Sequence, residues 1–253
     1  MERESLRDLP GSATEPDGSV VVRVLSYNIR SMRDDVPALA RVIRACRPDI
    51  VCVQEAPRFF RWRKAAARLA RTSGLVYVSG GATASGPMIL SSLRAHVERT
   101  EDVLLPRTPG LHQRGFATAV LRFGRARLGV LSCHLSSNDQ ERYEQGRLLL
   151  ERLAALDVPY AVAAGDFNDR PEGRTFGLLA GALQDGWATK PWGREHTTRL
   201  GDPLQRIDAV FATEAVEVLG CGVPIGLPDI SERDLRAATD HLPVLAALRV
   251  PSV

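Results

Sequence analysis

The sequence predicts an α/β or α+β fold, with helices and paired strands around a single core in one domain. Three observations predict it. Short apolar runs rich in β-branched residues alternate with segments whose apolar residues recur at helical spacing. Two of the apolar runs are joined by a short glycine-containing turn, which is typical of a β-hairpin. Beyond residue 19 the chain shows no internal repeat, low-complexity block or inter-domain linker.

The N-terminal half reads as a polar segment followed by strand, helix, strand and helix. Residues 1–19 mix Pro and Gly with charges, so we expect a flexible leader there. The apolar runs 20–25 and 50–53 predict two buried strands. Between them lies a helix with Val36, Leu39, Ala40 and Ile43 on its apolar face, which Pro48 stops. A second helix closes at Gly74 and has an apolar face made of Phe59, Trp62, Ala66 and Leu69.

The rest of the chain is richer in strands. We expect strands over residues 88–91, 97–105, 116–123, 128–133, 160–164, 207–211 and 243–250. Gly124 and Arg125 form the expected hairpin turn between the third and fourth of these. Asn138, with Glu141 three residues later, has the pattern of a capping box and predicts a helix start. That helix has an apolar face of Leu149, Leu150, Leu153 and Leu156.

Composition and net charge exclude only a few classes of function. The chain has 253 residues and a net charge of +3, which is too mild to indicate nucleic-acid binding from the overall field alone. The four cysteines form no CxxC pair, which favours a reduced protein, and we expect it in the cytoplasm. The first residues have no apolar core of a signal peptide, and no apolar run approaches the roughly 18–20 residues of a membrane span.

Polar side chains recur where predicted strands begin or end. One carboxylate at such a place is more often a turn residue or a helix cap. Here six clusters stand at the ends of different strands: Asn28, Glu55, His134, Asp166 with Asn168, Asp208, and Asp240 with His241. Side chains at strand ends converge on one pocket at the rim of a sheet core. We therefore expect these residues to form one functional site.

The types of these side chains indicate metal-dependent chemistry at phosphorus. Asn, Asp and Glu are hard oxygen donors, which suit Mg²⁺ or Mn²⁺. The five histidines lie too far apart in sequence for a zinc motif, so a zinc site is disfavoured. A divalent ion neutralises a phosphate, a carboxylate deprotonates a water, and an imidazolium stabilises charge or protonates the leaving oxygen.

Other catalytic templates are absent from the sequence. No GxxxxGK[ST] or GxSxG pattern occurs, which excludes a P-loop NTPase and a nucleophile elbow. The stretch around Cys221 lacks the third glycine of a dinucleotide fingerprint. Cys133 and His134 are consecutive in a predicted strand, so their side chains point to opposite faces and are not expected to act as a thiol–imidazole pair.

Six motifs occur in order along residues 20–250. They are Leu25-Ser26-Tyr27-Asn28-Ile29-Arg30, Val53-Gln54-Glu55, His134-Leu135-Ser136-Ser137, Gly165-Asp166-Phe167-Asn168, Arg206-Ile207-Asp208 and Thr239-Asp240-His241. Their order and separations resemble those of the endonuclease/exonuclease/phosphatase superfamily, the DNase I-like metal-dependent phosphoesterases. The resemblance implies a four-layer α/β/β/α sandwich, with two mixed β-sheets packed face to face and helices outside. It also implies that residues 20–253 form a single catalytic domain.

The resemblance assigns a role to each residue of the motifs. Glu55 is the implied principal ligand of a Mg²⁺ or Mn²⁺ ion, with Asn28 and Asp240 completing or supporting the site. Asp166 would activate the attacking water, and Asn168 would hold that water or a phosphate oxygen. The implied roles of the remaining residues are phosphate contact for His241, fixing of that imidazole for Asp208, and general acid or phosphate ligand for His134.

Three positions depart from the family pattern. Arg30 stands where several nucleases carry an acidic residue of a second metal site, which puts a two-metal arrangement in doubt. Thr239 replaces a commoner serine but keeps the hydroxyl. Pro87 lies in the stretch that resembles the family's central strand and is a candidate for a kink.

The substrate is the least determined feature. We expect a phosphate ester, with nucleic acid first and a small phosphate ester or phospholipid headgroup as the alternative. A catalytically silent binding module is a third hypothesis, and a monomer is the expected state. A basic run from Arg58 to Arg71, interleaved with Phe59, Phe60 and Trp62, is either a nucleic-acid surface or an amphipathic helix with solvated arginines. We expect loops at 58–74, 107–115 and 187–205 to set the specificity.

Overall fold

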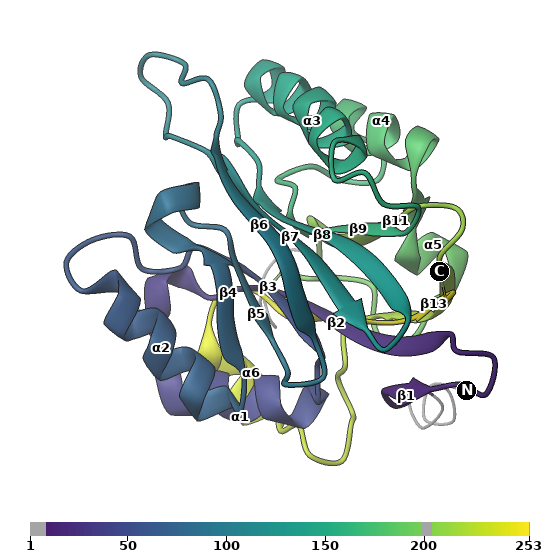
Figure 1. The fold of residues 1–253 in the computed structure, drawn as a ribbon. Helices are drawn as coiled ribbons and strands as arrows, with labels where there is room; N and C mark the ends of the chain where they lie inside the picture. Colours follow the sequence, from purple (N-terminus) through teal and green to yellow (C-terminus); the bar gives the residue numbers. More distant parts are fainter. Residues whose placement is uncertain (1–8, 199–203, 253) are drawn as a thin grey trace.

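Two β-sheets lie face to face in the computed structural model, which describes residues 9–198 and 204–252 (Figure 1). The first sheet has the strand order β12-β13-β2-β3-β5-β4, with β1 paired to β2 outside this path, and the second has the order β10-β11-β9-β8-β7-β6. The first sheet contains β1 (Ala13–Thr14), β2 (Val20–Asn28), β3 (Ile50–Gln54), β4 (Val76–Gly80), β5 (Met88–Ser91), β12 (Glu217–Gly222) and β13 (Val244–Val250). The second contains β6 (His96–Leu104), β7 (Gly115–Phe123), β8 (Ala126–His134), β9 (Ala161–Asp166), β10 (Gln184–Asp185) and β11 (Asp208–Ala212).

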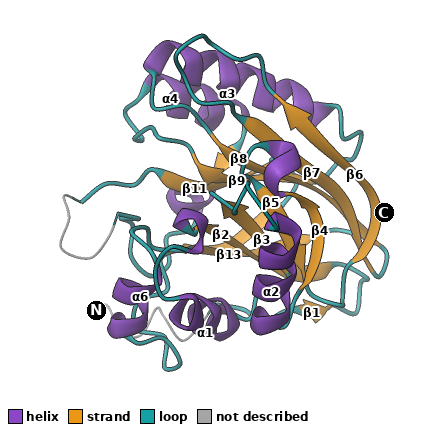
Figure 2. Cartoon of the chain, turned by 90° about the vertical axis from the view of Figure 1, so that its left-hand side faces the viewer, coloured by secondary structure: helices purple, strands orange, loops and turns teal. Residues whose placement is uncertain are grey.

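Helices cover both outer faces of this pair of sheets (Figure 2). The first sheet is covered by α1 (Val36–Cys46), α2 (Trp62–Ser73) and α6 (Glu232–Ala238), and the second by α3 (Asp139–Ala154) and α4 (Arg174–Ala182). The short α5 (Gly186–Thr189) contacts β11 and β12. The predicted four-layer α/β/β/α sandwich of two mixed sheets is therefore confirmed.

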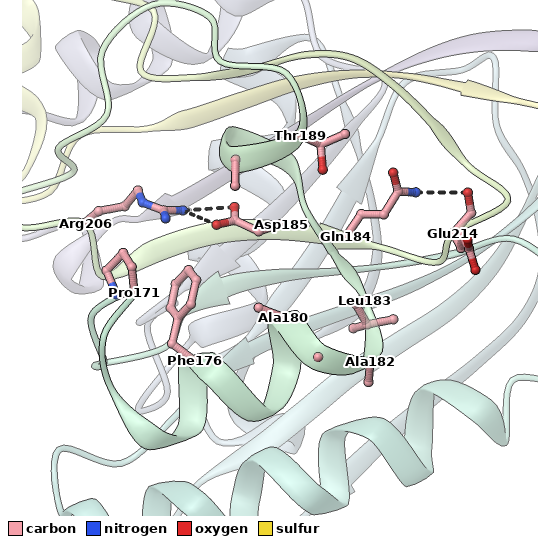
Figure 3. A pocket seen from close by; sticks show the side chains of 12 residues that line it. Pro171, Phe176, Ala180, Ala182, Leu183, Gln184, Asp185, Thr189, Arg206 and Glu214 are labelled. Carbon is pink, nitrogen blue, oxygen red and sulfur yellow. Dashed lines mark hydrogen bonds and ion pairs between the residues drawn. The ribbon is translucent and has the colours of Figure 1, made fainter.

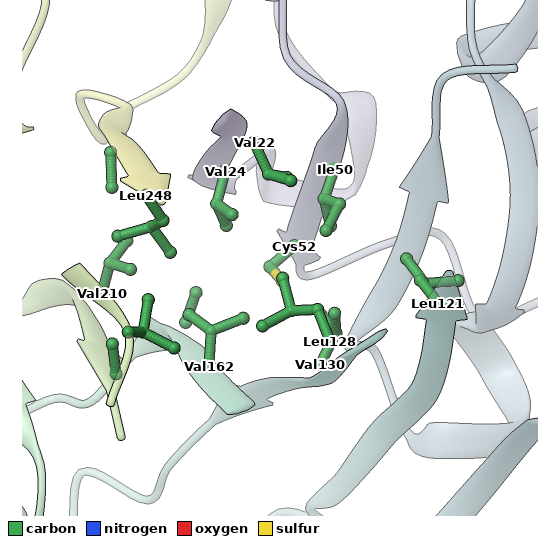
Figure 4. Close-up of a cluster of buried hydrophobic side chains, with 14 of the residues drawn as sticks. Val22, Val24, Ile50, Cys52, Leu121, Leu128, Val130, Val162, Val210 and Leu248 are labelled. Atoms are coloured by element: carbon green, nitrogen blue, oxygen red, sulfur yellow. The ribbon is translucent and has the colours of Figure 1, made fainter. Parts of the chain in front are cut away.

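The layer between the sheets is built mainly from valine, alanine and leucine. Val22, Val24 and Cys52 of the first sheet belong to the same buried cluster as Val130 and Val162 of the second (Figure 4). The central strands are buried on both faces, because helices cover the side that does not face the other sheet. Burial on both faces explains why these strands read as continuous apolar runs and not as alternating ones.

Among the described residues, each sheet contains one parallel pair of strands, β2 with β3 and β8 with β9. A parallel pair needs a crossover, and α1 and α3 supply the two crossovers. The pairing places Asn28 opposite Gln54 and His134 opposite Asp166. The carboxyl end of each parallel pair therefore carries residues of the sequence motifs.

Local sequence signals account for several helix ends. The Asp35 side chain accepts a hydrogen bond from the Ala38 amide at the start of α1, and the left-handed Gly74 ends α2 as expected. Asn138 caps α3 by accepting from the Glu141 amide. The reciprocal half of the capping box is not formed, because both carboxylate oxygens of Glu141 are buried without a hydrogen-bond partner. Phe59 lies before α2 and is 82% exposed, so the prediction that it belongs to the apolar face was wrong.

The remaining expected strands lie close to where the sequence put them, and the hairpin between β7 and β8 turns at Gly124 and Arg125. The strand after Pro87 starts at Met88, so the proline precedes the strand and does not kink it. Among the described strands and α-helices, the sequence analysis did not assign seven: β1, β4, β10, β12, α4, α5 and α6. These are short, or contain glycines in place of a continuous apolar pattern, as in the Glu-Val-Leu-Gly-Cys-Gly of β12.

The segment expected to be a flexible leader is partly ordered onto the first sheet. Residues 1–8 lie outside the described residues. Strand β1 pairs with the start of β2, and the Ser12 hydroxyl donates to the buried carboxylate of Asp49. That carboxylate also accepts from the Arg23 amide and from the guanidinium of Arg94, so it joins three segments. Burial of a carboxylate is tolerated here because each oxygen has charged or polar partners.

All four cysteines are free and buried, and no helix in the described part of the chain is both long and apolar enough to pass through a bilayer.

Gly165 shows how closely neighbouring strands approach beside the predicted Asp166. A Cβ atom at Gly165 would lie 2.2 Å from the carbonyl oxygen of Cys133 in the adjacent strand β8. No real Cβ contact is that short, and the clashing atom is backbone, so a side chain here requires the strands to separate. Gly177 in the middle of α4 is the opposite case, because nothing lies within 4 Å of a Cβ there.

We therefore predict opposite effects for the same substitution at these two positions. Gly165→Ala should lower the free energy of unfolding by roughly 3 kcal/mol through overpacking. Gly177→Ala should raise it by about 0.5–1 kcal/mol, because alanine is the better residue in an exposed helix interior. Urea unfolding of both variants measures the two values, and equal effects of both substitutions would contradict the packing argument.

Candidate active site

The ends of the two parallel strand pairs meet at one rim of the sandwich and line a pocket of about 430 Å³. Five of the eight predicted site residues line it: Glu55, His134, Asp166, Asn168 and His241. The other three are Asn28, Asp208 and Asp240, which lie behind the lining and contact it or its neighbours. The structure thus brings together every residue that the sequence analysis expected at the site.

The Asn28 side chain joins the two sheets at this rim. Its Nδ2 donates to Glu55 Oε1 at 3.2 Å and to Asp166 Oδ2 at 3.0 Å. Asn28 ends β2 in the first sheet and Asp166 ends β9 in the second, so this hydrogen bond crosses between sheets. Its Oδ1 accepts from the Arg30 amide at 3.1 Å, which fixes the orientation of the side chain. One buried amide therefore holds two carboxylates next to each other.

Asp166 is the most heavily contacted carboxylate of the site and is only 2% exposed. Its Oδ1 accepts from the Asn168 amide at 3.0 Å. Its Oδ2, besides the Asn28 contact, lies 3.4 Å from His134 Nε2 and 3.8 Å from His241 Nε2. A single carboxylate oxygen thus faces both predicted imidazoles.

His241 is held by Asp208 from behind. Its Nδ1 donates to Asp208 Oδ2 at 2.9 Å, and Asp208 is 1% exposed. Asp208 begins β11 directly opposite Asp166 in the antiparallel pairing with β9, which explains why both carboxylates reach the same ring. Burial by itself lowers the pKa of His241, but the carboxylates of Asp208, Asp166 and Asp240 outweigh burial and raise that pKa to about 10.

His134 has the opposite electrostatic character. Burial lowers the pKa of its imidazole to about 4, and the attraction of Asp166 only partly offsets this, while Arg114 and His241 lower it further. The ring is therefore neutral near pH 7.

Asp240 is tied to the rest of the site through its neighbour. The Thr239 hydroxyl lies 3.1 Å from the Asn28 carbonyl oxygen and 3.2 Å from Asp240 Oδ1. Asp240 Oδ2 is 3.2 Å from Arg30 Nε. The arginine that departs from the family pattern therefore places a cation directly beside one of the predicted metal ligands.

Backbone in the left-handed region is concentrated at this rim. Glu55 has a φ of 53° and Asn168 a φ of 49°, and the turn over Arg30–Met32 has φ values of 44°, 56° and 56°. Non-glycine residues rarely adopt this conformation, and such strain is typical of functional sites whose geometry the surrounding fold imposes. The left-handed residues lie directly after strands β2, β3 and β9, where the chain must turn while keeping polar side chains in the pocket.

The sequence analysis included Arg58 in a basic run and expected the loop 107–115 to set specificity. It did not assign Arg58, His112 or Arg114 to the site as individual residues. Arg58, His112 and Arg114 line the pocket, together with Ser31, Arg33, Ser85 and Ser137. Of the loops expected to set specificity, 107–115 reaches the pocket through His112 and Arg114. The segment 58–74 reaches it only through Arg58, and most of that segment is the helix α2 and not a loop. The third, 187–205, includes residues 199–203 outside the described part of the chain, and its Trp192 is buried against Gly220 rather than placed in the pocket.

Arg114 is notable among the missed residues. No hydrogen bond or ion pair of its guanidinium is present among the described residues, although it lies near Asp166 and Glu55. Burial lowers the pKa of Arg114, and the carboxylates of Asp166 and Glu55 oppose this shift. An arginine stays charged after such a shift. The pocket therefore holds a partly buried cation whose donors are free to meet an anion.

A larger cavity of about 630 Å³ lies between α4 and α5 but contains none of the predicted site residues (Figure 3). Arg206 projects into its wall and is paired there with Asp185 at 2.8 Å and with Glu195 at 3.3 Å. Its guanidinium also lies over the Phe176 ring. Two carboxylates already neutralise the Arg206 guanidinium. This cation therefore forms a structural ion pair and does not make the cavity an anion-binding site.

The oxygen donors at the rim fit a hard divalent cation. Among the described residues, the Glu55 carboxylate accepts one hydrogen bond, from the Asn28 amide group to Oε1, so its second oxygen is available to a ligand in the pocket. Asp166, Asp208 and His241 each offer an atom within 4.8 Å of the others. Carboxylate and amide oxygens are the donors that Mg²⁺ and Mn²⁺ prefer. That three-residue cluster shares no residue with the predicted ligand set of Asn28, Glu55 and Asp240, which stays a prediction.

The fold is shared with solved structures of low sequence identity. An endonuclease/exonuclease/phosphatase from Bacteroides vulgatus has a TM-score of 0.76 and 18% identity, covering 91% of this chain and 99% of that chain. The mannosyl-6-phosphatase Bt3783 of Bacteroides thetaiotaomicron has a TM-score of 0.73 and 19% identity, over 90% and 99% of the two chains. D. rerio TDP2, in complex with a single-strand DNA product, has a TM-score of 0.66 and 18% identity, over 90% and 98%.

No curated protein matches the chain. The sequence pattern described as the endonuclease/exonuclease/phosphatase family, however, matches residues 25–241. This span covers most of the chain, runs from the strand that carries Asn28 to His241, and contains all eight predicted site residues. The chain belongs to the endonuclease/exonuclease/phosphatase family.

Proposed function

We propose that this protein is a divalent-metal-dependent phosphodiesterase that hydrolyses a P–O bond of nucleic acid by in-line attack of an activated water. The observation that carries the proposal is the linked set Asp208–His241–Asp166–Asn28–Glu55, at a pocket that Arg33, Arg58 and Arg114 also line. Family membership supports phosphoester hydrolysis in general. The metal and the substrate are the parts that the experiments below test.

Asp166 is the group placed to orient and deprotonate the water. Two donors, the Asn28 amide group and the Asn168 backbone, already fix its carboxylate in the pocket. Fixed donors leave the carboxylate little freedom to rotate, which is what a general base needs to aim at one water. Asn168 is itself fixed, because its Nδ2 donates to the Leu135 carbonyl oxygen, so its amide oxygen is the end available to a water or the substrate.

His241 acts as an imidazolium that binds the phosphate. Asp208 accepts the hydrogen bond from Nδ1–H, so Nε2–H is the donor that is left for the pocket. The raised pKa keeps the ring charged at neutral pH and makes it a stronger electrostatic partner for a phosphate oxygen than a neutral donor. Its Nε2 lies 3.8 Å from Asp166 Oδ2, so the phosphate that it holds is next to the base.

A divalent ion, held by Glu55 with Asn28 and Asp240, would supply charge neutralisation of the phosphate. Arg30, which pairs with Asp240, takes the place where an acidic residue would support a second ion. We therefore propose one ion. Arg114, Arg58 and the neutral His134 would stabilise the remaining negative charge that develops on the phosphate oxygens.

A small phosphate ester is the second candidate substrate. The pocket wall gathers Arg58, Arg114 and His112, and such a cluster suits the two negative charges of a terminal phosphate. The structural neighbours point both ways, because one is a mannosyl-6-phosphatase and another is bound to a single-strand DNA product. Hydrolysis of p-nitrophenyl phosphate, bis-p-nitrophenyl phosphate, single- and double-stranded DNA, RNA and an abasic duplex separates the two candidates.

We predict that EDTA and the substitution Glu55→Gln both abolish activity, because each removes the same bound metal ion. EDTA should abolish hydrolysis of bis-p-nitrophenyl phosphate, and added Mg²⁺ or Mn²⁺ should restore it. Glu55→Gln should remove both the activity and the rise in melting temperature that Mg²⁺ causes in the wild-type protein, because a ligand stabilises only the state that binds it. Full activity in EDTA would refute the metal dependence.

We predict that Asp166→Asn lowers kcat by about a thousandfold, the scale of a lost general base. Asparagine keeps the shape and the packing but cannot accept the proton. His241→Ala should abolish turnover as well. The matched control is Asp229→Asn at an exposed aspartate, which should leave both kcat and the melting temperature unchanged. An Asp166→Asn enzyme with nearly wild-type kcat would exclude Asp166 as the base.

We predict that Arg114→Ala lowers kcat/KM by about a hundredfold, or about 2.7 kcal/mol, because a charged donor to the phosphate is lost. Arg114→Lys should recover part of that loss by restoring the charge without the fork of donors. Arg107→Ala, in the same loop but exposed and outside the pocket lining, serves as the control. Equal effects of Arg107→Ala and Arg114→Ala would show that only loop charge matters.

A further inference from the structure

A second, shallower cavity of about 410 Å³ continues from the active-site pocket. Ser31 lines both cavities, so the two meet at the left-handed turn after β2. From there the second cavity runs between that turn and α2, which lies beside α1 on the outside of the first sheet (Figure 2). We call it the α2 groove, and Phe60, Arg61, Lys64 and Arg68 line its α2 side. A substrate longer than the pocket has this groove as a continuation.

The α2 groove carries unneutralised positive charge. Arg61, Lys64 and Arg68 stand at the spacing that places residues on one side of a helix, and all three are exposed. None of the ion pairs in the described part of the chain involves them. The sequence from residue 56 to 97 contains no aspartate or glutamate at all. No carboxylate of this segment is therefore available to neutralise the three cations.

A largely exposed aromatic ring lies at the same groove. Phe60 is 89% exposed, and the Arg61 guanidinium lies 5.1 Å from the centre of its ring. A phenylalanine so exposed gains nothing from folding, because its apolar surface stays in water. Cations along a groove together with an exposed aromatic ring are the arrangement by which proteins bind single-stranded nucleic acid, with phosphates on the cations and a base stacked on the ring.

We propose that the α2 groove binds the strand that flanks the scissile phosphate, and that the substrate is single-stranded nucleic acid with a base stacked on Phe60. This inference rests on the proposed function and specifies its substrate. A duplex hides its base faces within the stack, so only an unpaired base reaches the ring. A groove that is concave and lined along one side by cations follows a chain of phosphates, which neither a small phosphate ester nor a single headgroup supplies.

The test is binding of a fluorescein-labelled single-stranded oligodeoxythymidine in EDTA, measured by fluorescence anisotropy over a range of salt. Lys64→Gln/Arg68→Gln removes two groove cations and should weaken binding about tenfold and make the salt dependence shallower by about 1.4 in the log–log slope. Arg63→Gln/Arg71→Gln removes two cations from the same helix that do not line the groove. That matched variant should bind within about twofold of the wild type.

A second pair of variants, one of them a matched control, tests the aromatic contact. Phe60→Ala should weaken binding about tenfold, the effect of one lost base stack. Phe59→Ala removes a ring that is 82% exposed but does not line the groove, and should leave binding unchanged. All four variants should hydrolyse bis-p-nitrophenyl phosphate at the wild-type rate, because that substrate does not extend into the groove.

Three results would overturn the inference. The two double variants could weaken oligonucleotide binding equally, or Phe60→Ala could bind the oligonucleotide as tightly as the wild type. The wild-type protein could also bind anionic phosphatidylserine vesicles more tightly than the oligonucleotide. The last result would assign the surface to a membrane instead. Because binding is measured in EDTA, it does not depend on turnover. A protein that binds the strand as expected but hydrolyses no phosphodiester would refute the proposed function and leave the groove assignment standing.

Discussion

The hydrogen bonds of one side-chain amide connect the two halves of this protein at its active site. Asn28 ends a strand of the first sheet and donates to Glu55 of the same sheet and to Asp166 of the other. These contacts are possible only because the sheets pack face to face with their parallel pairs ending at the same rim. Two carboxylates held close together repel each other, and the amide between them offsets part of that cost. The position of the proposed base relative to the proposed metal ligand follows from this one contact.

Burial and neighbouring charges give the two histidines of the site different pKa values. His134 and His241 both lie next to Asp166 Oδ2, yet their pKa values shift in opposite directions. His134 is buried and His241 is partly buried, and loss of water favours the neutral form of both rings. Only His241 has Asp208 at hydrogen-bond distance behind it, and this carboxylate reverses the effect of burial. The same pocket therefore offers a charged donor and a neutral one within reach of one phosphate.

Four of the six motifs contain the end of a strand and the turn after it, and the other two lead into a strand. The geometry of such a unit is local, so the motifs placed their polar residues at strand ends. Glu55, Asp166 and Asn168 fall where a buried run ends, and the structure places all of them in the pocket. Arg58 and Arg114 gave no comparable signal, since nothing in a loop sequence tells which of several arginines turns inward. The exposed loop residue Phe59 was assigned to a helix face because helical spacing was read through a segment that precedes the helix. The expected leader contains a strand because β2 offers an unpaired edge at Val20 and Val21, which the local composition does not reveal.

The sequence by itself determined the chemistry available to this protein. It supplied the order of the strands that carry Asn28, Glu55, His134, Asp166, Asp208 and His241, and the oxygen and nitrogen donors among them, because side-chain type and strand ends are properties of short segments. Only the tertiary structure decided which imidazole is charged, which arginines face the pocket, and that the pocket opens into the α2 groove. Those features depend on distances between residues far apart in the chain, such as the 2.9 Å between His241 and Asp208, and no local pattern encodes such a distance.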